Sequence, residues 1–129
     1  MLILDAVMDA LKILAVDNEP SVTLSLRYIF ARPRYELIDV ENGIDALARL
    51  DADSDPYDSI IVDQKMPHLT GVELVGAIRE RGIPGKIIVV AANLSSQIRE
   101  AYEQMDVHVM FGKPYDVGQL RSAVDRLAA

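Results

Sequence analysis

The sequence contains no cysteine among its 129 residues, which excludes a disulfide framework and any site built on thiolate ligands. Basic residues are scarce relative to acidic ones, 13 Lys and Arg against 20 Asp and Glu, so the net charge is -7. This balance argues against nucleic acid or an anionic membrane as the main partner. The apolar start of the chain is interrupted by Asp5, Asp9 and Lys12, so it neither reaches membrane-spanning length nor follows a basic targeting region.

Motifs of several enzyme classes are also missing. Dinucleotide-binding and P-loop proteins need a glycine-rich turn after the first strand, and the segment DNEPS at residues 17–21 has no glycine. The serine hydrolase pattern G-x-S-x-G does not occur. An aspartate-nucleophile hydrolase would carry a second Asp two residues after Asp17, where Glu19 stands. These absences disfavour all four of these classes.

Apolar segments alternate along the chain with amphipathic ones, which predicts strands alternating with helices. The expected strands are residues 12–16, 36–40, 59–62, 86–91 and 107–111. The expected helices are residues 21–30, 42–50, 70–81, 97–104 and 116–127, after a short extension, also expected to be helical, at residues 1–10. Asn42 is suited to cap the second of these helices, and Thr70 with Glu73 has the form of a capping box. Such alternation predicts an α/β fold, a parallel sheet covered by helices on both faces.

In folds of this kind the ligand site lies at the carboxyl ends of the strands. The sequence places polar residues at these ends: Asp17, Asn18 and Glu19 after the first strand, Asp63 after the third, and Lys113 after the fifth. Each has a less specific explanation, since acids often cap turns or helix starts and a loop lysine is often solvated. Their coincidence at one edge of a sheet favours a functional site.

Three segments, ILAVDNEPS, IIVDQKMPHLTG and MFGKPYDVGQL, carry a resemblance to a known family. From about Lys12 to its end, the chain resembles a receiver domain of bacterial two-component response regulators. The resemblance implies a doubly wound, five-stranded parallel sheet in the order 2-1-3-4-5, the flavodoxin-like or CheY-like three-layer sandwich. It also implies that Asp63 is the phosphoacceptor, taking a phosphoryl group from a sensor histidine kinase or a histidine phosphotransfer protein in the cytoplasm.

The resemblance further implies a Mg²⁺ site. Asp17, Asn18, Asp63 and the backbone carbonyl of Lys65 match the metal positions of the family, and a divalent cation would relieve the repulsion between the two aspartates. Lys113 matches the lysine that pairs with the acceptor and later with the phosphoryl group. The peptide bond between Lys113 and Pro114 is expected to be cis, as is frequent in the family.

Three positions depart from the family pattern. Asn18 replaces the second acid of an acidic pair, which lowers the charge available to a metal. Ala91 stands where the family has a hydroxyl residue after the fourth strand, and Met110 stands at the aromatic switch position. A hydrogen bond to a charged group contributes about 1.5–3 kcal/mol, comparable with the allosteric coupling it would carry. We therefore expect phosphorylation without the usual relay, unless Ser95 or Ser96 supplies a hydroxyl.

The hypothesis is thus a stand-alone receiver at residues 11–129, not an enzyme in the ordinary sense. Phosphorylation would change its binding to a downstream effector protein, with a homodimer through the fourth helix, fifth strand and fifth helix as a further expectation. Tyr102 and Tyr115 are candidates for that face, although an ordinary solvated surface explains them equally well. Two alternatives remain open: a pseudo-receiver that binds partners without using phosphate, and a small phosphohydrolase-like enzyme.

Overall fold

The computed structural model describes residues 10–129, so the predicted extension at residues 1–10 lies almost wholly outside the described residues. Five parallel strands form one sheet in the order β2-β1-β3-β4-β5, which confirms the predicted strand order. The strands are β1 (Leu11–Val16), β2 (Tyr35–Val40), β3 (Ser59–Asp63), β4 (Lys86–Ala91) and β5 (Val109–Gly112). The helices are α2 (Pro20–Ile29), α3 (Gly43–Ala52), α4 (Gly71–Glu80), α5 (Ser96–Glu103) and α6 (Val117–Ala128).

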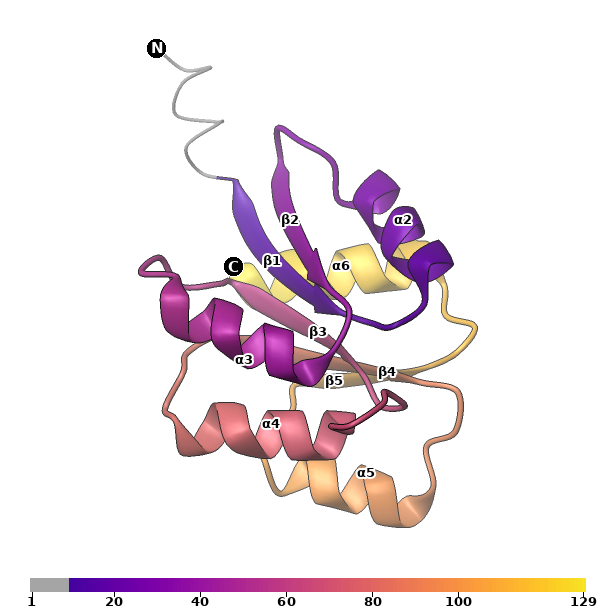
Figure 1. Cartoon of the computed structure of the whole chain (residues 1–129). Coiled ribbons are helices and arrows are strands. Elements are labelled where there is room, and N and C mark those ends of the chain that lie inside the picture. Colours follow the sequence, from indigo (N-terminus) through magenta and orange to yellow (C-terminus); the bar gives the residue numbers. More distant parts are fainter. Residues whose placement is uncertain (1–9) are drawn as a thin grey trace.

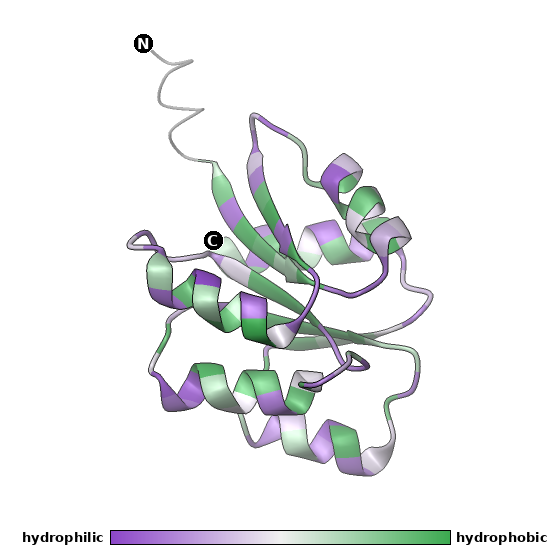
Figure 2. Cartoon of the chain, viewed as in Figure 1, coloured by the Kyte–Doolittle hydropathy of each residue, from purple (hydrophilic) through white to green (hydrophobic). Residues whose placement is uncertain are grey.

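The helices cover both faces of the sheet, so the described chain has three layers (Figure 1). On one face α3, α4 and α5 pack over one set of strand side chains, with Leu14, Ile60 and Ile87 fully buried among them. On the other face α2 and α6 cover the alternate set, which includes Ile13 and Ile88. The strands are largely apolar, and the helices alternate between apolar and polar sides (Figure 2), with a few apolar helix residues such as Leu24 and Ile44 exposed. This pattern is the one that a parallel sheet buried on both faces requires.

Local signals in the sequence determine where the helices begin. The Asn42 side chain accepts a hydrogen bond of 2.8 Å from the backbone N–H of Asp45, as a helix cap does. Thr70 and Glu73 form both bonds of a capping box at the start of α4. Pro20 occupies the first turn of α2, where its missing N–H leaves no bond unmade. These starts fix the loops between the strand ends and the helices.

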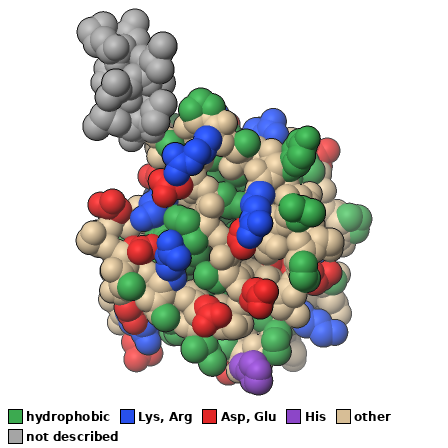
Figure 3. All heavy atoms as spheres, turned by 45° about the horizontal axis from the view of Figure 1, so that its top comes forward, with side chains coloured by type: hydrophobic (Ala, Val, Ile, Leu, Met, Phe, Trp, Pro, Cys, Tyr) green, Lys and Arg blue, Asp and Glu red, His purple; other side chains and the backbone are tan. Residues whose placement is uncertain are grey.

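The surface of the described chain is mixed in charge. On the face shown in Figure 3, acidic and basic side chains are interspersed with single apolar ones. Among residues 10–129, none of the helices has both the length and the apolar character that a membrane span needs.

Candidate functional site

Asp63 is the last residue of β3, and it is 3% exposed. The strand is buried along its whole length, so the acid is held by a rigid element at the carboxyl edge of the sheet. The backbone N–H of Lys65 interacts with its carboxylate and lowers its pKa slightly. Burial raises the pKa of Asp63, the charge of Asp17 raises it further, and Lys113 lowers it. The ionised carboxylate is therefore held in surroundings that disfavour its charge.

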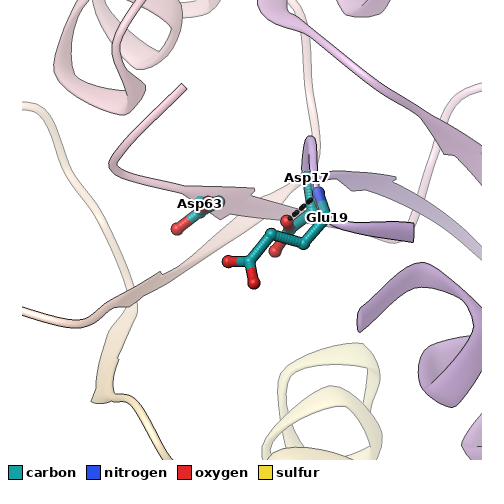
Figure 4. A group of neighbouring side chains, drawn as sticks. All are labelled: Asp17, Glu19 and Asp63. Carbon is teal, nitrogen blue, oxygen red and sulfur yellow. Dashed lines mark hydrogen bonds between the residues drawn. The ribbon is translucent and has the colours of Figure 1, made fainter. Parts of the chain in front are cut away.

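Asp17 follows β1, the strand that pairs directly with β3. It is 2% exposed, and its Oδ1 accepts a hydrogen bond of 2.9 Å from the backbone N–H of Glu19. This turn brings the Glu19 side chain back toward the strand ends. One carboxylate oxygen from each of Asp17, Glu19 and Asp63 lies within 4.8 Å of the other two. The three side chains are neighbours at the ends of their strands (Figure 4).

Lys113 reaches this group from the loop after β5. Its backbone N–H donates to the carbonyl of Ala91 at 2.7 Å, and its peptide bond to Pro114 is cis, as predicted. The Nζ atom lies 3.2 Å from Oδ2 of Asp17, 3.3 Å from Oδ1 of Asp63 and 3.4 Å from Oε1 of Glu19. Burial works to lower the pKa of Lys113, but the charges of Asp17 and Asp63 outweigh it and raise the pKa. The lysine thus stays charged beside two buried acids.

The other predicted site residues lie around this centre. Asn18 is exposed and lines a pocket of about 310 Å³ with Asp17 and residues of α2. Lys65 is exposed in the loop after β3. Ala91 ends β4 at 1% exposure, and Met110 in β5 is half-buried against the core beneath α3, α4 and α5.

The predicted metal set did not include Glu19. The sequence shows only that Glu19 stands two residues after Asp17. It does not show the turn that brings the Glu19 side chain to the site. With Glu19, three carboxylates and one ammonium group meet at the strand ends. Carboxylate oxygens are the ligands that Mg²⁺ prefers, and a cluster with excess negative charge suits a divalent cation. The residues present therefore fit such an ion.

Tyr102 does not lie on a surface, so its predicted place on a partner-docking face is wrong. The side chain projects from α5 into the core with 0% exposure, and its hydroxyl donates to Oε1 of Gln64, the residue after Asp63. Burial and then the charge of Asp63 raise its pKa. The spacing of Ile98, Tyr102 and Met105, three to four residues apart, was a signal for a buried helix face. Tyr115 is half-buried against the opposite face of the sheet.

Ser95 and Ser96, the two serines suggested as substitutes for a hydroxyl at Ala91, both lie at the start of α5. The Ser95 hydroxyl caps α5, accepting a hydrogen bond of 3.2 Å from the backbone N–H of Ile98. Ser96 is exposed at the first position of that helix.

This fold, with acids on two neighbouring strand ends and a lysine from the fifth, agrees with what the sequence comparisons find. The response regulator receiver domain model matches residues 13–125. The chain belongs to this family. Receiver domains are signalling domains rather than ordinary enzymes, and they interact with histidine kinases or phosphotransfer proteins and with downstream effectors.

Individual relatives show how far the similarity extends. Sporulation initiation phosphotransferase F of Bacillus subtilis is 24% identical over 89% of this chain and 91% of its own length. The transcriptional regulatory protein ResD of Bacillus subtilis is 33% identical over 71% of the chain, which spans only 38% of that longer protein. Among solved structures, the response regulator protein TrrA of Thermotoga maritima, in complex with Mg(2+)-BeF, is 31% identical. Its TM-score is 0.76, over 91% of this chain and 98% of TrrA.

Proposed function

We propose that Asp63 accepts a phosphoryl group from a phosphohistidine of a sensor kinase or phosphotransfer protein, and that this modification changes the binding of an effector protein. The observation that carries the proposal is the pairing of a buried strand-end carboxylate with Lys113 at 3.3 Å and with a second buried acid, Asp17. Membership of the receiver family supports the same role. The stand-alone action of residues 11–129 and a cytoplasmic location, where ATP-dependent kinases act, belong to this proposal.

The transfer needs little from the protein beyond position and charge. An oxygen of the Asp63 carboxylate attacks the phosphorus, the new P–O bond forms as the P–N bond to the histidine breaks, and the imidazole leaves with the bonding electrons. The ammonium of Lys113 stays beside the acceptor and pairs with the added negative charge. The backbone N–H of Lys65 lowers the pKa of Asp63, which favours the ionised carboxylate that attacks.

Asp17, Asp63 and Glu19 would hold Mg²⁺, together with Asn18 and the Lys65 carbonyl that the family resemblance adds. When bound, the ion supplies positive charge that offsets the repulsion between the carboxylates and the incoming phosphoryl oxygens. TrrA, a family member of similar fold, was determined in complex with Mg(2+)-BeF. The charge of the site supports a bound cation, because Lys113 alone leaves the three carboxylates with excess negative charge.

The test is intact mass after incubation with Mg²⁺ and acetyl phosphate, a donor that needs no kinase. Wild type should gain one phosphoryl group, and Asp63→Asn should gain none. Asp39→Asn is the matched control, because Asp39 is a largely buried acid in β2, bound to Arg27 instead of the site. A gain in Asp63→Asn equal to that of wild type would place the acceptor elsewhere and overturn the proposal.

A second candidate is a pseudo-receiver, a module that binds its partner without phosphate. Ala91 and Met110 favour it, since neither side chain can make the hydroxyl-to-aromatic link by which the family pattern relays the signal. No phosphoryl gain in wild type, with acetyl phosphate or with histidine kinases as donors, would favour this alternative. The partner should then be sought with the unmodified protein.

A further inference from the structure

A buried tyrosine hydroxyl is hydrogen-bonded to the residue next to the acceptor in the chain. Tyr102 of α5 donates its hydroxyl hydrogen to the side-chain oxygen of Gln64, which directly follows Asp63. Leaving a buried hydroxyl without a partner would cost about 1–3 kcal/mol. Separating Tyr102 from Gln64 would therefore cost free energy, so the hydrogen bond holds α5 and Gln64 together. Ile98 of α5 and Met105, just after the helix, pack against the same core cluster as Tyr102, so the tyrosine is held on both sides along the chain.

Gln64 is held by three neighbouring elements. Its backbone N–H donates to the carbonyl of Val90 in β4 at 3.1 Å, and its own carbonyl accepts from Gly71 at 2.9 Å. Its side-chain oxygen also accepts from the backbone N–H of Val72 at 3.2 Å. With Tyr102, these bonds join Gln64 to β4, to the first turn of α4 and to α5. A displacement of Gln64 therefore reaches two helices directly.

Phosphorylation of Asp63 would act on this residue first. Gln64 lies between Asp63 and Lys65, and the backbone N–H of Lys65 interacts with the Asp63 carboxylate. A phosphoryl group brings a charge of about -1.5 to -2 and several strong acceptor oxygens. The Lys65 N–H then faces a larger and more negative group. Both peptide units that flank Gln64 lie directly beside this change, and they carry the backbone hydrogen bonds to Val90 and Gly71.

The absence of a side chain at Gly71 makes space for the Tyr102 hydroxyl beside Asp63 and Gln64. A Cβ atom on Gly71 would lie 2.9 Å from the carbonyl oxygen of Asp63 and would also contact the Tyr102 hydroxyl. Glycine at the start of α4 thus lets the phenol reach the backbone beside the acceptor. The same glycine supplies an N–H to Gln64, so the helix start, the tyrosine and Gln64 form one unit.

We propose that the hydrogen bond between Tyr102 and Gln64 transmits the phosphorylation state of Asp63 to α5. Tyr102 is then a positioning residue that takes over the relay for which Ala91 and Met110 lack the groups. The surface that responds is the outer side of α5, where Arg99, Glu100 and Glu103 are exposed. This inference rests on the proposed function, because it needs a phosphorylated state to transmit.

The experiment measures hydrogen exchange of α5 amides by mass spectrometry, with and without Mg²⁺ and acetyl phosphate, and the intact mass of the same samples. In wild type, phosphorylation should change exchange in α5 by about fivefold or more, the lower range of allosteric couplings. Tyr102→Phe should gain the phosphoryl group equally but lose most of that change. Tyr57→Phe is the matched control, since Tyr57 is 4% exposed and its hydroxyl bonds Asp53 away from the site. It should respond as wild type does.

The readout is a difference between two states of each variant, so a general loss of stability cancels. Gln64→Met removes the acceptor instead of the donor, and the double variant with Tyr102→Phe should lose no more than either single variant. An α5 response retained in phosphorylated Tyr102→Phe would overturn the inference alone. Losses that add in the double variant would also overturn it, by showing a route that avoids Gln64. Absence of phosphoryl gain in wild type would overturn the proposed function and this inference together.

Discussion

Replacing Lys113 by Met should make the protein depend on a divalent cation for its stability. Lys113 is 17% exposed, while the Asp17 and Asp63 side chains beside it are 3% and 4% exposed. Methionine keeps much of the side-chain volume but removes the charge. Two buried carboxylates would then face each other with Glu19 nearby and without their cation.

The structure gives the size of the effect. At an effective dielectric constant of about 20, an ion pair at 3.3 Å is worth about 5 kcal/mol before desolvation is considered. The Asp17 pair at 3.2 Å is similar, whereas Glu19 is 57% exposed and adds little. Removing one partner of a buried pair typically lowers the unfolding free energy by about 3–5 kcal/mol. We expect a loss in this range for Lys113→Met in metal-free buffer.

The loss should depend on pH. Lys113 lowers the pKa of Asp63, which burial and Asp17 raise, so the variant should have a still higher pKa at this residue. A carboxyl group with a raised pKa in the folded state costs stability as pH rises from the unfolded value of about 3.9 toward the folded value. The gap between wild type and variant should therefore be smallest near pH 4 and largest near pH 7.

Urea unfolding at pH 4, 5.5 and 7, with chelator or with excess Mg²⁺, measures these terms. A ligand at ten times its Kd adds about 1.4 kcal/mol, and the more negative variant should gain more from Mg²⁺ than wild type does. Lys12→Met is the matched control, because Lys12 is also 17% exposed and pairs with Asp53 at 3.9 Å, away from the site. Equal losses in both variants, with equal Mg²⁺ increments, would refute the electrostatic account.

Three further predictions follow from the same contacts. Asp63→Asn should raise the unfolding free energy in metal-free buffer at pH 7, because it removes a charge that burial disfavours; urea unfolding checks this, and a loss would contradict it. Asn18→Asp should tighten Mg²⁺ binding roughly fivefold, since one exposed charge near the ion is worth about 1 kcal/mol; titration calorimetry decides. Gly71→Ala should lower stability by about 1–3 kcal/mol through overpacking against Asp63 and Tyr102, measured by thermal unfolding, and an unchanged midpoint would contradict the contacts.

The sequence was informative about the fold because its local and global signals agree. The apolar run at residues 86–91 predicted a strand, and β4 forms there and pairs with both β3 and β5. The caps at Asn42 and Thr70 began the helices where they were expected. The strand order came from the family resemblance, since periodicity alone does not determine which strands are neighbours. Element bounds shifted by one or two residues, as helix and strand ends usually do.

The site was predictable only as far as the strand ends define it. Asp17 and Asp63 end neighbouring parallel strands, so their meeting follows from topology. Glu19 joins them through a turn whose geometry depends on the Asp17 side chain accepting from the backbone. Tyr102 was predicted to be a surface residue because its polar hydroxyl was weighed above its place in the apolar spacing of the helix. Its spacing with Ile98 and Met105 carried the information, and a polar hydroxyl obscured it.

The charges at the site connect its stability to its chemistry. The folded chain holds Asp17 and Asp63 buried at neighbouring strand ends, and Lys113 offsets only part of their repulsion. A cation bound there would stabilise the fold and neutralise charge around the acceptor by the same interaction, so the affinity of each variant for Mg²⁺ should set how much its stability rises when Mg²⁺ is added. A phosphoryl group adds charge at the point where Gln64, Lys65 and α4 meet, and new pairing with Lys113 and the cation must offset it. On the proposed relay, the free energy that changes α5 would come from charges that are already poorly compensated before the transfer.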